Sequence, residues 1–254
     1  MAYSLTYSYN SSSQSYSVTG YSDITTSDKV VIPSTYNDGT NGEHPVTSIG
    51  NSALRNCKSL VNISIPDSVT SIGFGAFWGC TSLTRVKIPN SVTSIGNAVF
   101  SDCKSLTSVT IGSGVTSIGN DSFNGCTSLT SVTIPDSVTS IGEYLFTDSN
   151  SLKQLILFPP TPPTLGFSAI PLTIQSIYVP QSSKAAYQEA DNWASFASKI
   201  VSDNLYLSFV RFNQKNKEYI GDGLNNKLTT PTTPNADSAI TMTADGTVGT
   251  KPLS

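Results

Sequence analysis

A 23-residue repeat constrains this chain more than any other feature. The pentapeptide VTSIG occurs five times at one interval, at residues 46–50, 69–73, 92–96, 115–119 and 138–142. Self-similarity at a fixed period is typical of solenoids, in which a single unit cannot bury its apolar face and stacked units share a core. The repeat therefore predicts a stack of short coils.

Two columns of apolar residues keep the same interval. They are the aromatic column Phe77, Phe100, Phe123 and Phe146, headed by Leu54, and the leucine column Leu60, Leu83, Leu106, Leu129 and Leu152. In an extended segment, alternate side chains point to opposite faces. This alternation predicts that Val109 and Ile111 face the core and that Thr107, Ser108 and Thr110 point outward.

The composition excludes several classes of partner. Ser and Thr make up 71 of the 254 residues, and the net charge is only −3. A chain of this charge has no basic surface for nucleic acid or for an anionic membrane. It also has no apolar stretch long enough to span a bilayer. We expect neither a nucleic-acid partner nor membrane insertion.

The four cysteines, Cys57, Cys80, Cys103 and Cys126, follow the same period. A disulfide framework or a zinc site would show clustered pairs, and the chain has a single histidine, His44. We therefore expect buried free thiols that act as small apolar residues. No catalytic triad or carboxylate pair is evident, so we expect no enzyme, no cofactor and no metal.

The repeat unit resembles the cysteine-bearing, 23-residue leucine-rich repeats of the BspA type, found in bacterial and protist surface proteins and in some phage structural proteins. The resemblance covers roughly residues 30–180. It implies a mainly β, right-handed leucine-rich-repeat β-solenoid that binds proteins or surfaces and has no catalytic centre. Regular repeats are expected over about residues 46–157.

The ends of the solenoid are expected to be capped. Alternation over residues 3–21 predicts a β-hairpin at the N-terminal end. The longer connection Ser34–Pro45 is expected to be a protruding loop, and residues 182–201 an amphipathic capping helix. With these caps, residues 1–202 form one predicted domain.

Residues 203–254 have a different character and are predicted to be a small β-rich appendage. A strand is expected at 205–213, a Thr/Pro linker at 229–235, and a hairpin that turns at Asp245-Gly246. The tail resembles modules of phage fibre and virion appendage proteins. The N-terminus shows no secretory signal, which agrees with assembly in a host cytoplasm.

These features together predict a non-catalytic virion appendage, such as a tail or head fibre, located in the virion. The solenoid would bind a host-surface protein or glycan. The C-terminal region would join other virion proteins or form a homotrimer. The alternative is a bacterial cell-surface leucine-rich-repeat adhesin.

One coil carries unusual residues at four positions, compared with the equivalent positions of the other coils. Phe74 and Trp78 stand where other coils carry mainly polar residues, and Arg85 and Lys87 replace residues that are mostly Ser, Thr or Asn. Aromatic rings suit protein hot spots or the faces of sugars. These four residues, with Arg55 at the position of Trp78 in the preceding coil, are the candidate binding site. The alternatives are drift and packing against the Ser34–Pro45 loop.

Overall fold

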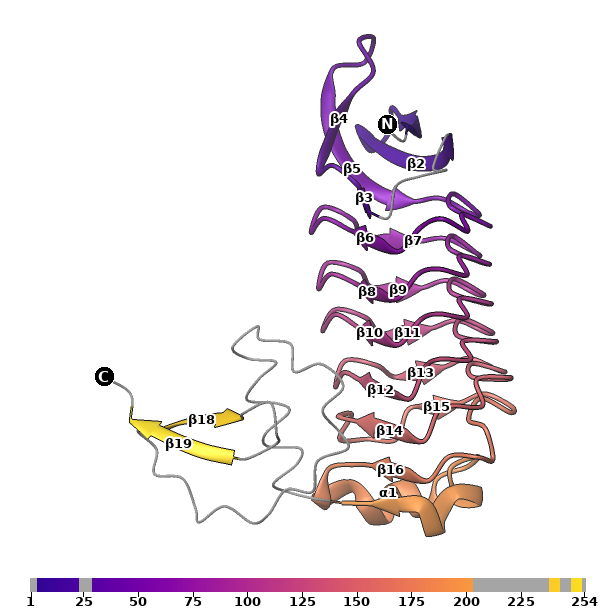
Figure 1. Cartoon of the computed structure of the whole chain (residues 1–254), viewed down its shortest axis with the longest axis vertical. Helices are drawn as coiled ribbons and strands as arrows, with labels where there is room; N and C mark the ends of the chain where they lie inside the picture. The colour runs from indigo at the N-terminus through magenta and orange to yellow at the C-terminus, as the bar shows by residue number, and fades with distance from the viewer. Residues whose placement is uncertain (1–3, 23–28, 203–237, 243–247, 253–254) are drawn as a thin grey trace. The chain divides into compact units, whose positions relative to one another are not determined.

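Each repeat forms one coil of a stack, and most coils contribute one strand to each of two walls (Figure 1). The computed structural model describes residues 4–22, 29–202, 238–242 and 248–252. The chain divides into two compact units, residues 1–209 and 210–254. The stack lies in the first unit, and its coils are numbered here from the one that contains the first VTSIG.

The VTSIG segments build the first wall. Its strands are β5 (Glu43–Ile49), β7 (Ser71–Ile72), β9 (Ser94–Ile95), β11 (Ser117–Ile118), β13 (Ser140–Ile141) and β15 (Thr164–Leu165). All of these strands pair in parallel, and Ser71 is aligned with Ser94 and Ser94 with Ser117. The sequence period is therefore the register of the sheet.

The second strand of each coil builds the opposite wall in two pieces. One piece contains β3 (Lys29–Val31), β6 (Asn62–Ser64), β8 (Arg85–Lys87) and β10 (Ser108–Thr110). The other contains β12 (Ser131–Ile134), β14 (Gln154–Leu157), β16 (Ser176–Tyr178) and β17 (Ile200–Val201). The predicted mainly β solenoid is confirmed.

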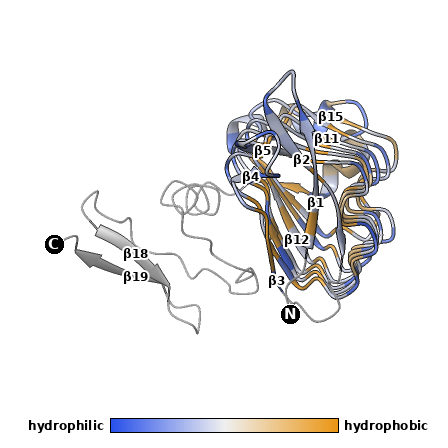
Figure 2. Cartoon of the chain, turned by 90° about the horizontal axis from the view of Figure 1, so that it is seen from above, coloured by the Kyte–Doolittle hydropathy of each residue, from blue (hydrophilic) through white to orange (hydrophobic). Residues whose placement is uncertain are grey.

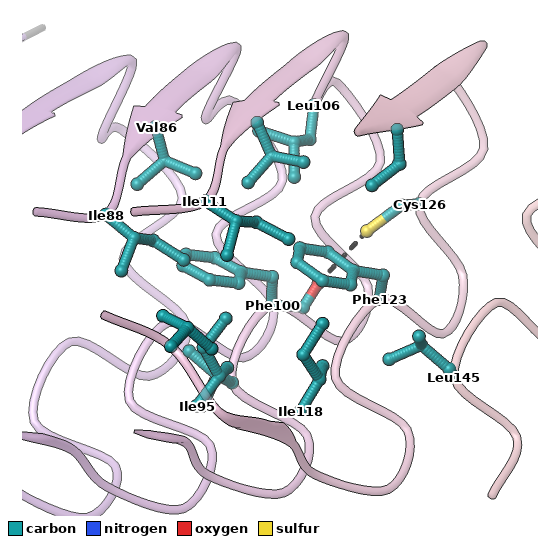
Figure 3. Close-up of a cluster of buried hydrophobic side chains, with 14 of the residues drawn as sticks. Val86, Ile88, Ile95, Phe100, Leu106, Ile111, Ile118, Phe123, Cys126 and Leu145 are labelled. Carbon is teal, nitrogen blue, oxygen red and sulfur yellow. Dashed lines mark hydrogen bonds between the residues drawn. The ribbon is translucent and has the colours of Figure 1, made fainter. Parts of the chain in front are cut away.

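The apolar columns fill the space between the walls. Seen down the stack, apolar positions of successive coils overlie one another (Figure 2). The rings of Phe77 and Phe100 stack with centroids 5.2 Å apart and an interplanar angle of 2°. Figure 3 shows Phe100 and Phe123 packed among isoleucines from both sides of the coil. Each phenylalanine thus buries its faces against the neighbouring coils.

Hydroxyl groups join successive coils. The Ser68 Oγ donates to the carbonyl of Val46 at 2.7 Å, and the Ser137 Oγ donates to that of Val115 at 2.6 Å. The Thr116 Oγ1 donates in the same way to the carbonyl of Thr93 at 3.1 Å. The abundance of Ser and Thr therefore contributes to the contacts between coils as well as to the surface.

Ser108 shares the outward face of the sheet with Arg85, but its side chain is only 5% exposed. It lies in β10 and is aligned with Arg85 of β8. Side chains aligned in a parallel ladder share one face of the sheet, so the outward direction of a side chain does not by itself make it exposed.

The cysteines are buried and free, as predicted. Each thiol of Cys80, Cys103 and Cys126 donates to a carbonyl 26 residues earlier; the bond from Cys126 is the dashed line in Figure 3. In coil 5, Ser149 replaces the cysteine, and its Oγ donates to the carbonyl of Phe123 at 2.7 Å. Serine and cysteine therefore have the same role in this column.

The N-terminal cap is a hairpin of β1 (Ser4–Asn10) and β2 (Ser15–Ser22), as predicted, and β2 pairs with β5. The connection Ser34–Pro45 is not a plain loop. Its β4 (Thr35–Asn37) pairs antiparallel with the start of β5. Tyr36 stacks on Tyr7 at 3.8 Å between ring centroids, which holds this second hairpin against the cap.

The C-terminal cap is not the single helix predicted for residues 182–201. It contains three short helices, η1 (Gln181–Ser183), α1 (Lys184–Glu189) and η2 (Ala194–Lys199). The chain leaves helical geometry at Ala190, which is extended, and Asn192 has a φ of 63°. This break places Trp193 in the core, where it is fully buried.

Buried side chains on either side of this break bond to the proline-rich stretch 158–171. The carbonyls of Pro159 and Pro163 accept hydrogen bonds from the Tyr187 hydroxyl at 2.9 Å and from the Trp193 Nε1 at 2.8 Å. Because proline has no N–H, such a stretch cannot form a regular ladder, and its buried carbonyls need other donors. The cap supplies those donors.

In the second unit, β18 (Ser238–Met242) pairs antiparallel with β19 (Val248–Pro252), as predicted for the hairpin. The strand expected at 205–213, the linker at 229–235, the turn at Asp245-Gly246 and the domain boundary after residue 202 lie outside the described residues.

We predict that Trp193→Phe lowers the free energy of unfolding by about 1–3 kcal/mol, because the buried carbonyl of Pro163 loses its donor. Urea denaturation of the full chain measures this change. Trp78→Phe is the matched control, because the Trp78 Nε1 donates to the carboxylate of Asp102, which is partly exposed and can bond to water instead. A loss as large in the control would contradict the role given to the Pro163 bond.

We also predict that stability falls as the pH rises above 9.0, the ordinary thiol pKa. Burial raises the pKa of Cys80, Cys103 and Cys126 well above that value. The unfolded chain therefore releases thiol protons that the folded chain retains, a loss of about 1.4 kcal/mol per pH unit for each thiol.

Urea midpoints measured between neutral pH and pH 10 test this dependence. The control is the triple variant Cys80→Ser, Cys103→Ser, Cys126→Ser, which keeps the hydrogen bonds that Ser149 demonstrates. Tyrosines titrate equally in both chains, so the difference between their pH-dependent urea midpoints reports the thiols alone. Equal pH dependence in both chains would show that the thiols are not responsible.

Candidate functional site

The candidate aromatic residues lie on one edge of the solenoid, where each coil turns from the first wall to the second. We call this the turn edge; it comprises residues 51–56, 74–79, 97–102, 120–125, 143–148 and 167–172. Two positions in each of the first five segments have a positive φ. The first column contains Ser52, Gly75, Ala98, Asp121 and Tyr144, and the second contains Asn56, Gly79, Asp102, Gly125 and Asp148.

Glycine lets the turn segments approach one another closely. A Cβ on Gly119 would lie 2.7 Å from the backbone nitrogen of Asn97, closer than side chains normally come. The last residue of VTSIG therefore permits the spacing between coils on this edge.

An asparagine column runs along the turn edge, directly after VTSIG. The Asn97 Oδ1 accepts from the backbone N–H of Asn120, and the Asn120 Oδ1 accepts from that of Glu143, both at 3.0 Å. The Asn51 Oδ1 accepts from the N–H of Phe74 at 2.9 Å. Phe74 has no side-chain oxygen, so the column is interrupted in coil 2.

Phe74 and Trp78 are in contact, as their spacing suggested. Their ring centroids are 6.2 Å apart at an angle of 82°. Phe74 is 45% exposed, whereas Trp78 is only half-buried rather than fully exposed. The Trp78 Nε1 donates to an Asp102 carboxylate oxygen at 3.2 Å, and the Arg55 guanidinium carbon lies 4.2 Å from the Trp78 ring centroid.

We call Arg55, Phe74, Trp78 and Asp102 the aromatic cluster; it spans three successive coils. Sequence reasoning missed Asp102, because it occupies a positive-φ column in which Asn, Gly and Asp are ordinary turn residues. The signal that would have found it is its offset of 24 residues from Trp78, one coil and one residue along the chain.

Arg85 and Lys87 lie elsewhere in the same coil. Both are exposed on β8, on either side of the buried Val86. Lys87 borders a shallow recess with Asp67 and Pro89. The structure therefore brings Arg55, Phe74 and Trp78 together on the turn edge and places Arg85 and Lys87 on the second wall.

The described residues contain no group of three or more His, Cys, Asp or Glu that would hold a metal ion. His44 is engaged in the N-terminal hairpins, where its Nε2 lies 3.0 Å from the carbonyl oxygen of Asn41 and 3.3 Å from the Tyr9 hydroxyl. In the part of the chain that the structure describes, no helix is long and apolar enough to cross a membrane.

Comparison with known proteins agrees with this architecture. Residues 41–162 match the family described as BspA type leucine rich repeat region, in six copies, and such repeats are generally non-catalytic. The crystal structure of a T. pallidum leucine rich repeat protein is similar, with a TM-score of 0.58 and 28% identity over 77% of this chain and 92% of that one.

A leucine rich cell surface protein from Faecalibacterium prausnitzii A2-165 is also similar, with a TM-score of 0.52 and 26% identity. The match covers 78% of this chain and 52% of that protein, so this chain spans about half of its length. No curated protein matches the chain. The repeat spacing, the coil geometry and these similarities agree: residues 41–162 match the BspA-type leucine-rich repeats and share their fold.

Proposed function

We propose that this chain is a non-catalytic recognition module displayed at a bacterial cell surface, and that the aromatic cluster binds a surface protein or glycan. The similarity to a protein described as a cell surface protein supports the location. The virion appendage expected from the sequence remains a prediction, without support from the proteins that this chain resembles.

The observation that carries the proposal is the exposed Phe74. It stands in a column where asparagine side chains form hydrogen bonds between successive coils. At this position an asparagine would accept the backbone N–H of the next coil, as Asn97 and Asn120 do. In place of that hydrogen bond, the Phe74 ring gives the fold an edge contact with Trp78. A ring that costs a hydrogen bond and remains 45% exposed is better explained by a partner than by folding.

The surroundings of Trp78 agree with a binding role. Arg55 lies against its ring and Asp102 accepts its N–H, so the indole is held in one orientation before any ligand arrives. Binding by a side chain that is already ordered loses less conformational entropy. Trp and Arg are also the residue types that dominate the energetics of protein interfaces.

We predict that Phe74→Asn raises the free energy of unfolding by about 0.5–1.5 kcal/mol, because it restores one hydrogen bond between coils, and that it weakens binding. Binding of the labelled full chain to a printed glycan array and to immobilised cell-surface proteins measures the second effect. Trp78→Ser should weaken the same interaction. Undiminished binding by both variants would exclude the aromatic cluster.

Val31→Thr is the matched control, since Val31 is also 45% exposed but lies on β3 in the second wall. It should leave binding unchanged. Arg85→Ser and Lys87→Ser test the two candidate binding residues that lie on β8. If these two variants lose binding while Phe74→Asn and Trp78→Ser keep it, the site lies on β8 and the turn edge is not the binding surface.

A further inference from the structure

A second exposed aromatic pair lies on the turn edge. Tyr144 is 39% exposed and Phe167 is 68% exposed. Their ring centroids are 5.7 Å apart at an angle of 80°, close to the arrangement of Phe74 and Trp78. Phe167 follows Leu165 and Gly166 as Phe74 follows Ile72 and Gly73, and the β13–β15 register aligns these segments. Phe74 and Phe167 therefore occupy the same column.

Tyr144 occupies an unfavourable position for its side chain. Its φ is 55°, in the left-handed region, and the equivalent residue in coil 2 is Gly75. A bulky residue is disfavoured there, because its Cβ crowds the backbone. Backbone strain of this kind is concentrated at functional sites. Each aromatic pair thus contains one ring whose position suits another residue better. Asparagine in place of Phe74 would add a hydrogen bond between coils, and glycine in place of Tyr144 would relieve the backbone.

The surface between the two pairs is polar and acidic: residues 97–102, 120–125 and 143–148 include Asp102, Asp121, Glu143 and Asp148 and no Lys or Arg. In the shared column it consists of Asn97, Asn120 and Glu143. The Oδ1 atoms of both asparagines are engaged with the next coil, and among the described residues their Nδ2 groups have no acceptor. These amides are donors available to a ligand. With coils about 4.8 Å apart, four coil steps separate Phe74 from Phe167 by about 19 Å.

We propose that the two aromatic pairs and the intervening asparagines form one elongated site for an extended neutral oligosaccharide that runs parallel to the stack. This inference rests on the proposed function and names its ligand class. Aromatic rings pack against the apolar faces of sugar rings, and amide N–H groups donate to hydroxyl oxygens. A polymer with a regular repeat matches an edge with a regular repeat, and Glu143 disfavours an acidic chain through like-charge repulsion.

The test is calorimetric titration of the full chain with neutral β-1,4-linked oligosaccharides of glucose and of N-acetylglucosamine, from the disaccharide to the hexasaccharide. We expect affinity to rise with length in one series, because only the longer sugars reach both pairs. Tyr144→Gly and Phe167→Ser should each lower the affinity for the hexasaccharide about tenfold and leave the disaccharide affinity within a few fold. Absence of binding in both series would overturn the ligand class.

A stability measurement separates binding from packing. Tyr144→Gly relieves the strained backbone, so its melting temperature should equal or exceed that of the parent chain. Ala98→Gly, in the same column but without a ring, is the matched control and should raise the melting temperature without changing affinity. A clear fall in the melting temperature of Tyr144→Gly would assign Tyr144 to packing and overturn its place in the site.

The variants also separate this inference from the proposed function. If Phe74→Asn loses binding and Tyr144→Gly and Phe167→Ser keep it, the aromatic cluster acts alone and the elongated site is wrong. If none of the three variants changes binding, the proposed function fails as well. A protein ligand lost by variants of both pairs, with no oligosaccharide bound, would replace the glycan by a protein partner.

Discussion

The hydrogen bond from one coil to a carbonyl of the neighbouring coil is the interaction on which the whole solenoid depends. Most strands in the two walls have only two to four residues, too few to be stable alone. Hydroxyl and thiol side chains add bonds of the same kind, at offsets of 22, 23 and 26 residues. A coil therefore contributes stability only through its neighbours, and both ends of the stack need caps.

The repeat predicted the core and the walls because a side chain at a fixed period meets its equivalent in the next coil. It did not predict the burial of Ser108, because alternation gives the direction of a side chain and not what covers it. The three short helices of the C-terminal cap were missed because an amphipathic pattern does not reveal that proline carbonyls need buried donors at Tyr187 and Trp193.

The candidate site was predicted in part. Comparison within columns found Phe74, Trp78 and Arg55, which the structure brings into one cluster. Phe167 escaped the same comparison, because Gly166 follows Gly142 by 24 residues instead of 23. Counting at a fixed period ends before Phe167, and the pairing of β13 with β15 supplies its column. Tyr144 is in register with Asp121 and was not singled out.

The single register of the first wall has a consequence for how such a surface changes over evolutionary time. Gain or loss of one whole coil leaves every remaining side chain in its own surroundings, since each coil contacts only its neighbours. It shifts two points on the turn edge apart or together by about 4.8 Å. The distance between two binding residues on this edge therefore changes in discrete steps, each encoded by about 23 residues. Duplication of one coil lengthens that distance and leaves the surroundings of both binding residues unchanged.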